Sequence, residues 1–513
     1  MLFITFFCFL SNIISCISYT VLLCGFAMSA ESEDDENWHA KFFYAGPPLL
    51  ASIDEEDGVP VVESPSFLEL HSATRHYREM ADAFVKQLSM SHEVALRTEE
   101  IFNTTQSLSH HLEKKISKTA ELLEHNAFVL EEILKPFPVD AIETSASNLV
   151  CRIGVESAVE SSSDDVQQTI ARYIPSFSAR NSNGGNVNEE QPYDEAVQII
   201  AHLTRDWSKE GAILRDEFSW IQEELWRYHN ETTLSPILVP GAGIGRLAFD
   251  LAFAKEEERT SDCVTSYPFA VEAMDNSIVM ASAAHHLFHN EAHTRNIYPF
   301  VSDSLSNEVD TQRRWDSVQI PEQSIVDKIR SMHNQQPHQQ PRLSYTVGDF
   351  VTTYSSPSKQ GHYGSLVSVF FIDTATNIFE YIWTIRHSLR RGGIWINYGP
   401  VQWHQNAQLH PTTNELRDMI EAGGFEVKHW EVSEKLVAYR HPDDLDSAHS
   451  NERGSRSTRS EAYRPLKFVA VLKSVDSGSN GQEECLLSSI QKVRLSTGRR
   501  SIIQHDFVEE PDE

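Results

Sequence analysis

Cysteine is scarce in this chain, and its few positions exclude a framework of disulfides. Six cysteines occur among 513 residues, and three of them fall in the apolar N-terminal stretch. The six positions are Cys8, Cys16, Cys24, Cys151, Cys263 and Cys485. Their spacings match neither a disulfide scaffold nor a metal-binding motif. The scarcity indicates a reducing compartment, and we expect the cytoplasm or also the nucleus.

Basic residues are also few, with 43 Lys and Arg against 74 Asp and Glu, for a net charge of −31. A field of this sign repels phosphate backbones and anionic lipid, which makes the chain a poor candidate for binding nucleic acid or anionic membranes through its general charge. The one short basic run, RGSRSTR at 453–459, lacks the aromatic side chains that stack on bases. We therefore predict no nucleic-acid partner.

Charge is missing altogether from the first 30 residues. Their apolar length could span a membrane or form a signal peptide, but the positive region of a signal peptide is absent. Two alternatives stay open. Either residues 1–27 are a real targeting or anchoring segment, or translation begins at Met28. In both cases we expect residues 1–66 to form an apolar stretch and an acidic, disordered leader.

Hydrophobic periodicity divides the remaining chain into three parts. Apolar residues at three- and four-residue spacing predict a helical region over 67–230, interrupted by a polar loop at 155–192. Short strand-like runs then alternate with helices over 231–473. The polar composition of 474–513 predicts a disordered tail.

The strand-like runs predict the fold class. Because amphipathic helices separate most of them, we expect an α/β, doubly wound, mostly parallel sheet with helices on both faces. The runs lie at 237–241, 267–275, 343–350, 365–373, 394–400, 425–432 and 466–473. No helix separates the last two, which indicates an antiparallel pair at the sheet edge.

A glycine-rich turn follows the first run, in ILVPGAGIGRLAFDLA (237–252). Ligands of such sheets bind beyond the carboxyl ends of the strands, where Gly241, Gly243 and Gly245 lie. The dinucleotide fingerprint needs its third glycine at position 246, which is Arg246. The Gly-Lys-Ser/Thr ending of a P-loop is missing too. These absences favour a cofactor without pyrophosphate, such as S-adenosylmethionine.

An acid after the second strand should bind the ribose hydroxyls of such a cofactor. The run VEAMD offers Asp275, with Glu272 as the alternative. Further along, in the sequence GDF, Asp349 can accept a hydrogen bond from an adenine amino group and Phe350 can cover the ring. A helix N-cap beside a core phenylalanine is the alternative for this pair.

A cluster of histidines, HHLFHNEAH, places His285 with His289 and His289 with His293 at the i, i+4 spacing of zinc ligands. No cysteine or second pair of ligands accompanies them. We interpret them as core or solvated histidines and predict no metal.

Five segments together resemble the carnosine N-methyltransferase family. They are RDWS (205–208), VPGAGIGRLA (239–248), GDF (348–350), FFIDTATNIFEYI (370–382) and GGIWINYGP with a following histidine (392–404). The similarity covers about 67–473. Members of this family are class I S-adenosylmethionine-dependent enzymes that methylate the imidazole ring of carnosine, β-alanyl-histidine, giving anserine. The resemblance implies a class I methyltransferase domain over 231–473, S-adenosylmethionine as cofactor and a small-molecule substrate.

The resemblance also implies which residues hold the cofactor. They are His202, Arg205, Gly241, Gly243, Gly245, Asp275, Asp349, Phe350 and Val369. Arg205 would clamp the methionine carboxylate as a bidentate fork. His202 stands where the family has glutamine and can still donate one hydrogen bond. Val369 stands where the family has cysteine and keeps only a backbone or van der Waals contact.

On the substrate side, the resemblance implies that Asp373, His404, Tyr439 and Tyr463 hold the dipeptide, with Asp373 and His404 catalytic. Methyl transfer needs a neutral imidazole nitrogen, and a histidine ring with a pKa of about 6.5 is mostly neutral at cytosolic pH. A carboxylate such as Asp373 that accepts the opposite ring N–H fixes the tautomer and strengthens the nucleophile. A helix N-cap is the alternative role for Asp373.

Two rival functions and the oligomeric state stay open at this level. The same chemistry could act on another imidazole compound or on a protein histidine. A non-catalytic scaffold with this fold is the alternative from a different class. The sequence leaves a homodimer open.

Overall fold

The computed structural model describes residues 40–45, 52–53, 60–61, 67–104, 107–137, 140–141, 195–228, 236–254, 269–289, 294–302, 308–322, 325, 342–439, 458 and 461–473. The apolar stretch at the N-terminus, the loop over 155–192 and the tail over 474–513 lie outside these residues, so the expectations for them stay predictions. In the described part of the chain, every helix is too short or too polar to cross a membrane.

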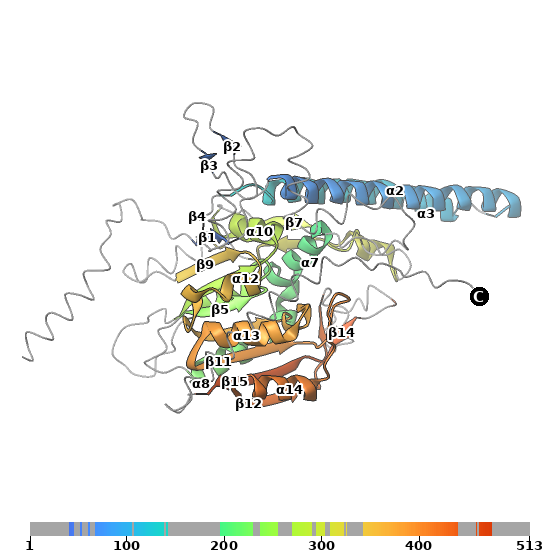
Figure 1. Ribbon diagram of the computed structural model, residues 1–513. Coiled ribbons are helices and arrows are strands. Elements are labelled where there is room, and N and C mark those ends of the chain that lie inside the picture. Colours follow the sequence, from blue (N-terminus) through green and yellow to red (C-terminus); the bar gives the residue numbers. More distant parts are fainter. Residues whose placement is uncertain are drawn as a thin grey trace, which may run out of the picture. The chain divides into compact units, whose positions relative to one another are not determined.

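A nine-stranded sheet forms the centre of the fold (Figure 1). Its strands lie in the order β12-β15-β11-β10-β5-β6-β9-β1-β4. In chain order they are β1 (Lys41–Tyr44), β4 (Asp140–Ala141), β5 (Ile237–Pro240), β6 (Ala270–Asp275), β9 (Arg342–Val347), β10 (Tyr363–Val369), β11 (Leu389–Gly399), β12 (Phe425–Val432) and β15 (Leu466–Leu472). All pairings are parallel except the two made by β15. The predicted α/β, mostly parallel sheet is confirmed, including its antiparallel pair at the edge.

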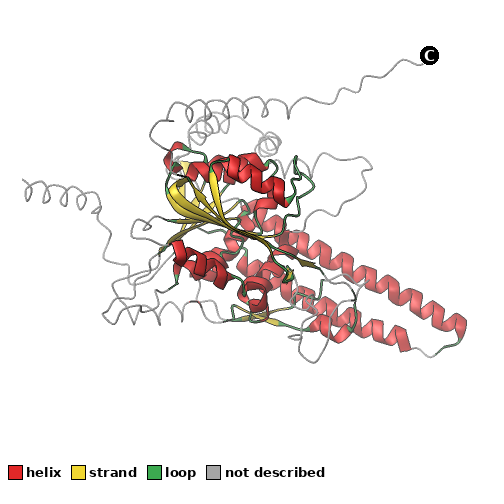
Figure 2. Cartoon of the chain, turned by 90° about the horizontal axis from the view of Figure 1, so that it is seen from below, coloured by secondary structure: helices red, strands yellow, loops and turns green. Residues whose placement is uncertain are grey.

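Helices cover both faces of this sheet (Figure 2). On one face, helices α12, α13 and α14 bury their apolar side chains against Leu366, Trp395 and Phe468 of the strands. Helices α8, α9 and α10 pack against β11, β6 and β9. The helices of this part are α7 (Glu195–Trp207), α8 (Phe218–Tyr228), α9 (Arg246–Ala252), α10 (Ile278–His289), α12 (Phe350–Tyr354), α13 (Ile378–Ser388) and α14 (Thr413–Ala422). Local sequence starts α14, because Thr412 and Glu415 form a capping box.

Short 3₁₀ helices and small two-stranded sheets connect these elements. The 3₁₀ helices are η1 (Glu210–Arg215), η3 (Thr311–Trp315), η4 (Pro357–Lys359) and η5 (Ile372–Thr374). The small sheets pair β2 (Ser52–Ile53) with β3 (Pro60–Val61), β7 (Arg295–Ile297) with β8 (Val318–Ile320), and β13 (Val437–Ala438) with β14 (Ala462–Tyr463).

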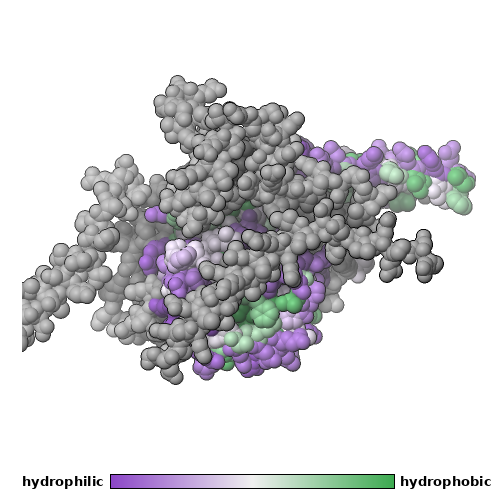
Figure 3. Space-filling model, in the orientation of Figure 1, coloured by the Kyte–Doolittle hydropathy of each residue, from purple (hydrophilic) through white to green (hydrophobic). Residues whose placement is uncertain are grey.

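Two long helices, α2 (Phe67–Phe102) and α3 (Ser107–Ile133), form the predicted N-terminal helical region and lie side by side (Figure 1). Asn126 of α3 is fully buried and fixes this hairpin to the rest of the fold. Its Nδ2 donates to the Tyr77 hydroxyl at 3.0 Å and to the Tyr298 carbonyl at 2.9 Å, and its Oδ1 accepts from the Tyr298 amide at 2.9 Å. Apolar side chains are exposed where α2 passes into α3, and green atoms lie among purple ones at the right-hand end of Figure 3. The exposed residues are Met90, Val94, Ile101, Phe102 and Leu108.

The expectation of a disordered leader is wrong for residues 40–45. Lys41–Tyr44 form β1, which pairs in parallel with β9 and β4. Phe42 is 4% exposed, and its ring stacks on Tyr345 at 5.3 Å and meets Phe137 edge-on at 5.4 Å. A four-residue run is too short to show a period, so only its distant partners make it a strand.

Candidate active site

The glycine turn adopts a backbone that other residues would resist. Gly241, Gly243 and Gly245 have φ angles of 66°, 54° and 78°. This left-handed region costs other L-residues about 1–2 kcal/mol each. A Cβ on Gly241 would lie 2.5 Å from Phe371, and one on Gly245 would lie 2.9 Å from Phe288. The turn is therefore bare backbone for both conformational and packing reasons.

Asp275 ends β6 and is bound to this turn. Its Oδ2 accepts a hydrogen bond from the Gly243 amide at 2.9 Å, and its Oδ1 accepts from the Ser277 amide at 3.0 Å. Burial raises the pKa of Asp275, and these backbone hydrogen bonds oppose that rise. A carboxylate has about four acceptor positions, so two donors leave room for ribose hydroxyls.

Glu272, the alternative acid, is committed to the interior. It accepts hydrogen bonds from the hydroxyls of Tyr363 at 2.6 Å, Tyr354 at 2.7 Å and Thr346 at 2.9 Å, and the Lys359 ammonium lies 3.1 Å away. Burial favours its neutral form, but Lys359 and the tyrosine hydroxyls hold the pKa of Glu272 below its usual range. Asp275, not Glu272, is the acid that lies at the turn.

Arg205 and His202 lie in the last two turns of α7, next to the glycine turn. Arg205 Nη2 lies 2.8 Å from His202 Nδ1. A guanidinium only donates, so Nδ1 accepts and the ring proton is on Nε2. Burial and the charge of Arg205 lower the pKa of His202, which keeps this ring neutral. Because a Cβ on Gly243 would lie 3.3 Å from Nδ1, the ring contacts the turn directly.

The residues predicted to hold adenine lie next to Asp275, because the Gly348 amide donates to its carbonyl at 3.0 Å. Asp349 caps α12 by accepting from the Thr352 amide at 2.7 Å, and its side chain is exposed. Phe350 is buried, with its ring 5.2 Å from that of Phe371. The helix-cap alternative thus describes their intramolecular contacts, and their adenine role stays a prediction.

The structure brings Asp373 and His404 together. The His404 amide donates to the Asp373 carbonyl at 3.2 Å, and Asp373 Oδ2 accepts from the Gln402 amide at 3.1 Å. Asp373 is 5% exposed, whereas the His404 side chain is exposed. Burial raises the pKa of Asp373, opposed by the Gln402 amide and by nearby His404. Asp373 is part of η5 and does not cap α13, which Asn377 caps.

Tyr439 and Tyr463 lie at the ends of the paired strands β13 and β14, with ring centroids 6.4 Å apart at 85°. Phe370 completes an aromatic cluster with them, 5.0 Å from Tyr439 and 6.4 Å from Tyr463. The Arg205 guanidinium lies 5.0 Å above the Tyr439 ring. Arg205, predicted for the cofactor, and Tyr439, predicted for the substrate, therefore lie against each other.

Sequence reasoning missed Phe370. Its φ angle is 50°, a left-handed conformation that is rare for a bulky residue. Such outliers gather at functional sites, where the surrounding structure maintains them. The only signal in the sequence is its position between Val369, the half-buried last residue of β10, and Asp373.

The histidine pair of α10 belongs to the packing around β1. The rings of His285 and His289 stack at 4.2 Å. The two ring nitrogens of His289 lie 2.9 Å from the Ala40 carbonyl and 3.2 Å from the His285 carbonyl. His293 lies outside the described residues. Among the described residues, groups of three or more His, Cys, Asp or Glu side chains suited to a metal ion are absent.

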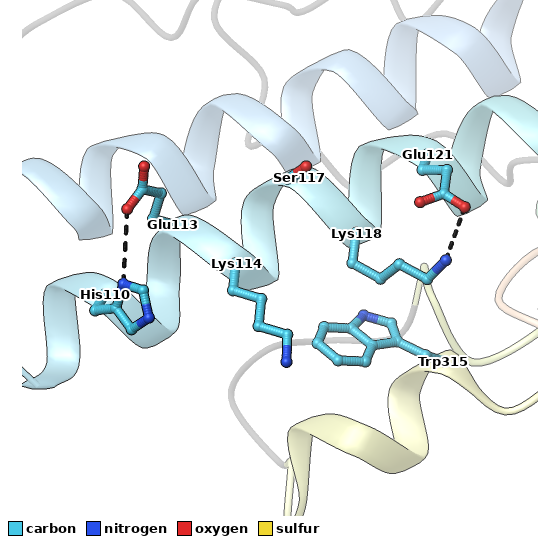
Figure 4. Close-up of a pocket in the computed structure, with 7 residues that line it drawn as sticks. All are labelled: His110, Glu113, Lys114, Ser117, Lys118, Glu121 and Trp315. Carbon is cyan, nitrogen blue, oxygen red and sulfur yellow. Dashed lines mark hydrogen bonds and ion pairs between the residues drawn. The ribbon is translucent and has the colours of Figure 1, made fainter.

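A separate pocket of about 550 Å³ lies between α3 and η3, away from these residues (Figure 4). In this view Lys114 of α3 ends beside the Trp315 indole, whereas Lys118 runs past the indole toward Glu121. Lys118 already pairs with Glu121 at 2.7 Å on the exposed helix surface. None of the residues lining this pocket is among the predicted site residues.

Comparison with known proteins identifies a matching family. The sequence model of a family described as carnosine N-methyltransferase matches residues 183–470. The carnosine N-methyltransferase of Schizosaccharomyces pombe is 29% identical over 263 residues, which cover 47% of this chain and 64% of that protein. The Drosophila melanogaster relative is 29% identical over 251 residues, 46% of this chain and 48% of that protein. The Mus musculus protein is 27% identical over 252 residues, which cover 46% of this chain and 55% of that protein.

The match thus spans between 48% and 64% of the length of these relatives. The family model covers more than half of the chain, and the glycine turn, Asp373 and His404 all lie within it. The chain belongs to the carnosine N-methyltransferase family.

Proposed function

We propose that this chain is an S-adenosylmethionine-dependent N-methyltransferase that methylates an imidazole nitrogen of carnosine, giving anserine, and of related histidine dipeptides. The observation that carries the proposal is the buried carboxylate of Asp373. It lies just after β10, at the same edge of the sheet as the glycine turn that follows the neighbouring strand β5. Phe371 joins the two, because it packs against Gly241 two residues before Asp373.

The residues of the turn fit the cofactor. The bare backbone of the three glycines allows close approach, and Asp275 keeps acceptor positions for ribose hydroxyls. Arg205 and the Nε2–H of His202 would hold the methionine end, and Asp349, Phe350 and Val369 the adenine end. When bound, S-adenosylmethionine supplies an electrophilic methyl group.

Asp373 would accept the N–H of the substrate imidazole and leave the other ring nitrogen unprotonated for attack. Its burial favours this role, because a carboxylate removed from water gains more from a hydrogen bond to a ring that becomes positive. His404 would position the dipeptide. The rings of Phe370, Tyr439 and Tyr463 would exclude water and stabilise the growing positive charge through their faces.

The geometry favours an enzyme over a scaffold of the same fold. Keeping an ionised carboxylate buried is unfavourable unless it is paired, and the contact that holds the Asp373 carboxylate is one backbone amide, that of Gln402. Ionisable groups whose pKa values are shifted by burial cluster at functional sites. Another imidazole compound or a protein histidine is the remaining alternative, because the ring chemistry is identical.

A substrate panel tests the proposal. Carnosine, homocarnosine, histidine and histidine peptides are incubated with the chain and methyl-labelled S-adenosylmethionine, and the products are identified by mass spectrometry and NMR. We expect carnosine to be methylated on the ring with the highest kcat/KM. Transfer to a protein histidine alone would replace the substrate, and transfer to none of these would contradict the proposal.

A further inference from the structure

We propose that Asp206 is a positioning residue that orients Arg205 and His202 toward the amino-acid end of the cofactor. The inference rests on the proposed function and extends it to a carboxylate between the two predicted ligands. Asp206 is 3% exposed. Its Oδ1 accepts from Arg205 Nε at 2.7 Å and its Oδ2 from Arg205 Nη2 at 3.0 Å.

This pair of hydrogen bonds fixes the plane of the Arg205 guanidinium. Two parallel N–H···O bonds between planar groups leave little rotation, which is why such forks give geometric specificity. The two hydrogen bonds occupy the edge of the guanidinium formed by Nε and Nη2, so Nη1 lies outside the edge that Asp206 binds. The same Nη2 also meets His202 Nδ1 at 2.8 Å, which places the His202 proton on Nε2. One carboxylate therefore sets the direction of both donors.

The charges of the site maintain this arrangement. Burial on its own would raise the pKa of Asp206, but the charge and hydrogen bonds of Arg205 hold it well below its usual range. Asp206 is therefore an anion throughout the physiological range. The pairing also raises the pKa of Arg205 despite its burial. Neither partner can become neutral and release the other.

The backbone beneath the pair is held from η1. Arg215 donates through Nη1 to the Arg205 carbonyl and, at 3.1 Å, to the Ser208 carbonyl. A cation at these carbonyls also complements the dipole of α7. The backbone of Gly211 also packs closely against the end of α7, because a Cβ at this position would lie 2.2 Å from the Arg205 carbonyl oxygen.

Arg246 ties the same helix end to the glycine turn. It directly follows Gly245, at the position where a dinucleotide fingerprint has glycine, and its Nη1 donates to the Asp206 carbonyl at 2.9 Å. Glu322 bridges it to Arg215, with distances of 3.0 Å and 3.1 Å. The end of α7 that carries Arg205 is thus joined through Asp206 to the residue that follows the glycine turn.

Two ligands separate positioning from a general structural role. S-adenosylhomocysteine has the amino-acid end, and 5′-methylthioadenosine lacks it while keeping the nucleoside. For Asp206→Asn we expect calorimetry to show S-adenosylhomocysteine bound about tenfold more weakly or worse, because outer-shell residues commonly have effects of this size. The affinity for 5′-methylthioadenosine should change by less than about twofold. If this variant does not fold, Asp206→Glu keeps the charge but displaces the guanidinium, and the same change in ligand preference is expected.

Glu308→Gln is the matched control. It removes a mostly buried carboxylate that binds Arg314 at 2.7 Å, far along the chain from the site. Its ratio of ligand affinities should equal that of the unchanged chain. Equal weakening of both ligands by Asp206→Asn, or unchanged or tighter binding of S-adenosylhomocysteine, would overturn the inference. Failure of the unchanged chain to bind either ligand would overturn the proposed function and the inference with it. Binding of both without methylation of any imidazole would contradict the proposed function alone.

Discussion

At the scale of single residues, burial is what would prepare Asp373 for its proposed role. Its carboxylate is removed from water and is held by one backbone amide, at 3.1 Å. A group in this state interacts strongly with any hydrogen-bond donor that reaches it. The same environment makes its ionised form unfavourable for folding, so activity and stability depend on the same side chain in opposite directions.

Replacing Asp373 by asparagine keeps the shape of the side chain and removes its charge. We expect kcat for carnosine to fall by about 10²-fold or more, because the ring that becomes positive loses its anion. The affinity for S-adenosylhomocysteine should stay within about twofold of the unchanged chain, since the proposed contact of Asp373 is with the substrate. Steady-state kinetics and calorimetry measure the two quantities. A normal rate in this variant would show that another group accepts the imidazole proton.

The same variant should change how stability depends on pH. Burial raises the pKa of Asp373 above its value in the unfolded chain. Its contribution to stability is then fully present below the unfolded pKa and is lost as the pH rises through the folded pKa. Asp373→Asn is neutral at every pH, so its Tm at pH 7 should exceed that of the unchanged chain, with a smaller difference near pH 4. Thermal unfolding at both pH values tests this, and a lower Tm at pH 7 would refute it.

At the scale of elements, Asn126 connects the α2–α3 hairpin to the β7 region. Its side-chain amide forms hydrogen bonds with the backbone N–H and carbonyl of Tyr298 and with the Tyr77 hydroxyl. We expect Asn126→Ala to lower the free energy of unfolding by about 2–4 kcal/mol, because a buried donor and acceptor lose their partners. Urea unfolding followed by circular dichroism measures the change.

Arg78→Ala is the control within the same hairpin. Arg78 of α2 pairs with Glu124 at 2.7 Å and Glu131 at 2.9 Å, both on the exposed surface of α3. Exposed ion pairs of this kind contribute about 1 kcal/mol or less. If both variants lose the same stability, the hairpin is held by its surface charges and not by Asn126.

At the scale of the whole molecule, β1 extends the sheet with a strand from the N-terminal part of the chain. A chain beginning at Met28 keeps this strand, and we expect it to be soluble and fully active. A chain beginning at Gly46 lacks Phe42 and should lose about 3–5 kcal/mol of stability, the effect of deleting a buried aromatic ring. It also uncovers the edge of β9, which favours aggregation. Thermal unfolding and size-exclusion chromatography compare the two. Loss of activity in the chain from Met28 would mean that residues 1–27 contribute to the fold or its targeting.

The sequence by itself determined the elements whose causes are local. Apolar runs that are mostly separated by helices along the chain predict β5, β6, β9 to β12 and β15. A strand that helices cover needs apolar side chains along its own length. Gly241, Gly243 and Gly245 predict a bare turn, since only glycine adopts their backbone without strain. The absence of a glycine at position 246 excluded a dinucleotide.

Only the tertiary structure decided the features whose partners are distant in the chain. Asp206 shows no motif of its own, and its proposed role involves a contact with Arg246, 40 positions later. The left-handed conformation of Phe370 likewise accompanies a contact with β11. The burial of Phe42 follows from contacts with β9 and α10. Periodicity records which face of an element is buried but not which residue covers it. A buried charge or ring is therefore understood only when the groups around it are known.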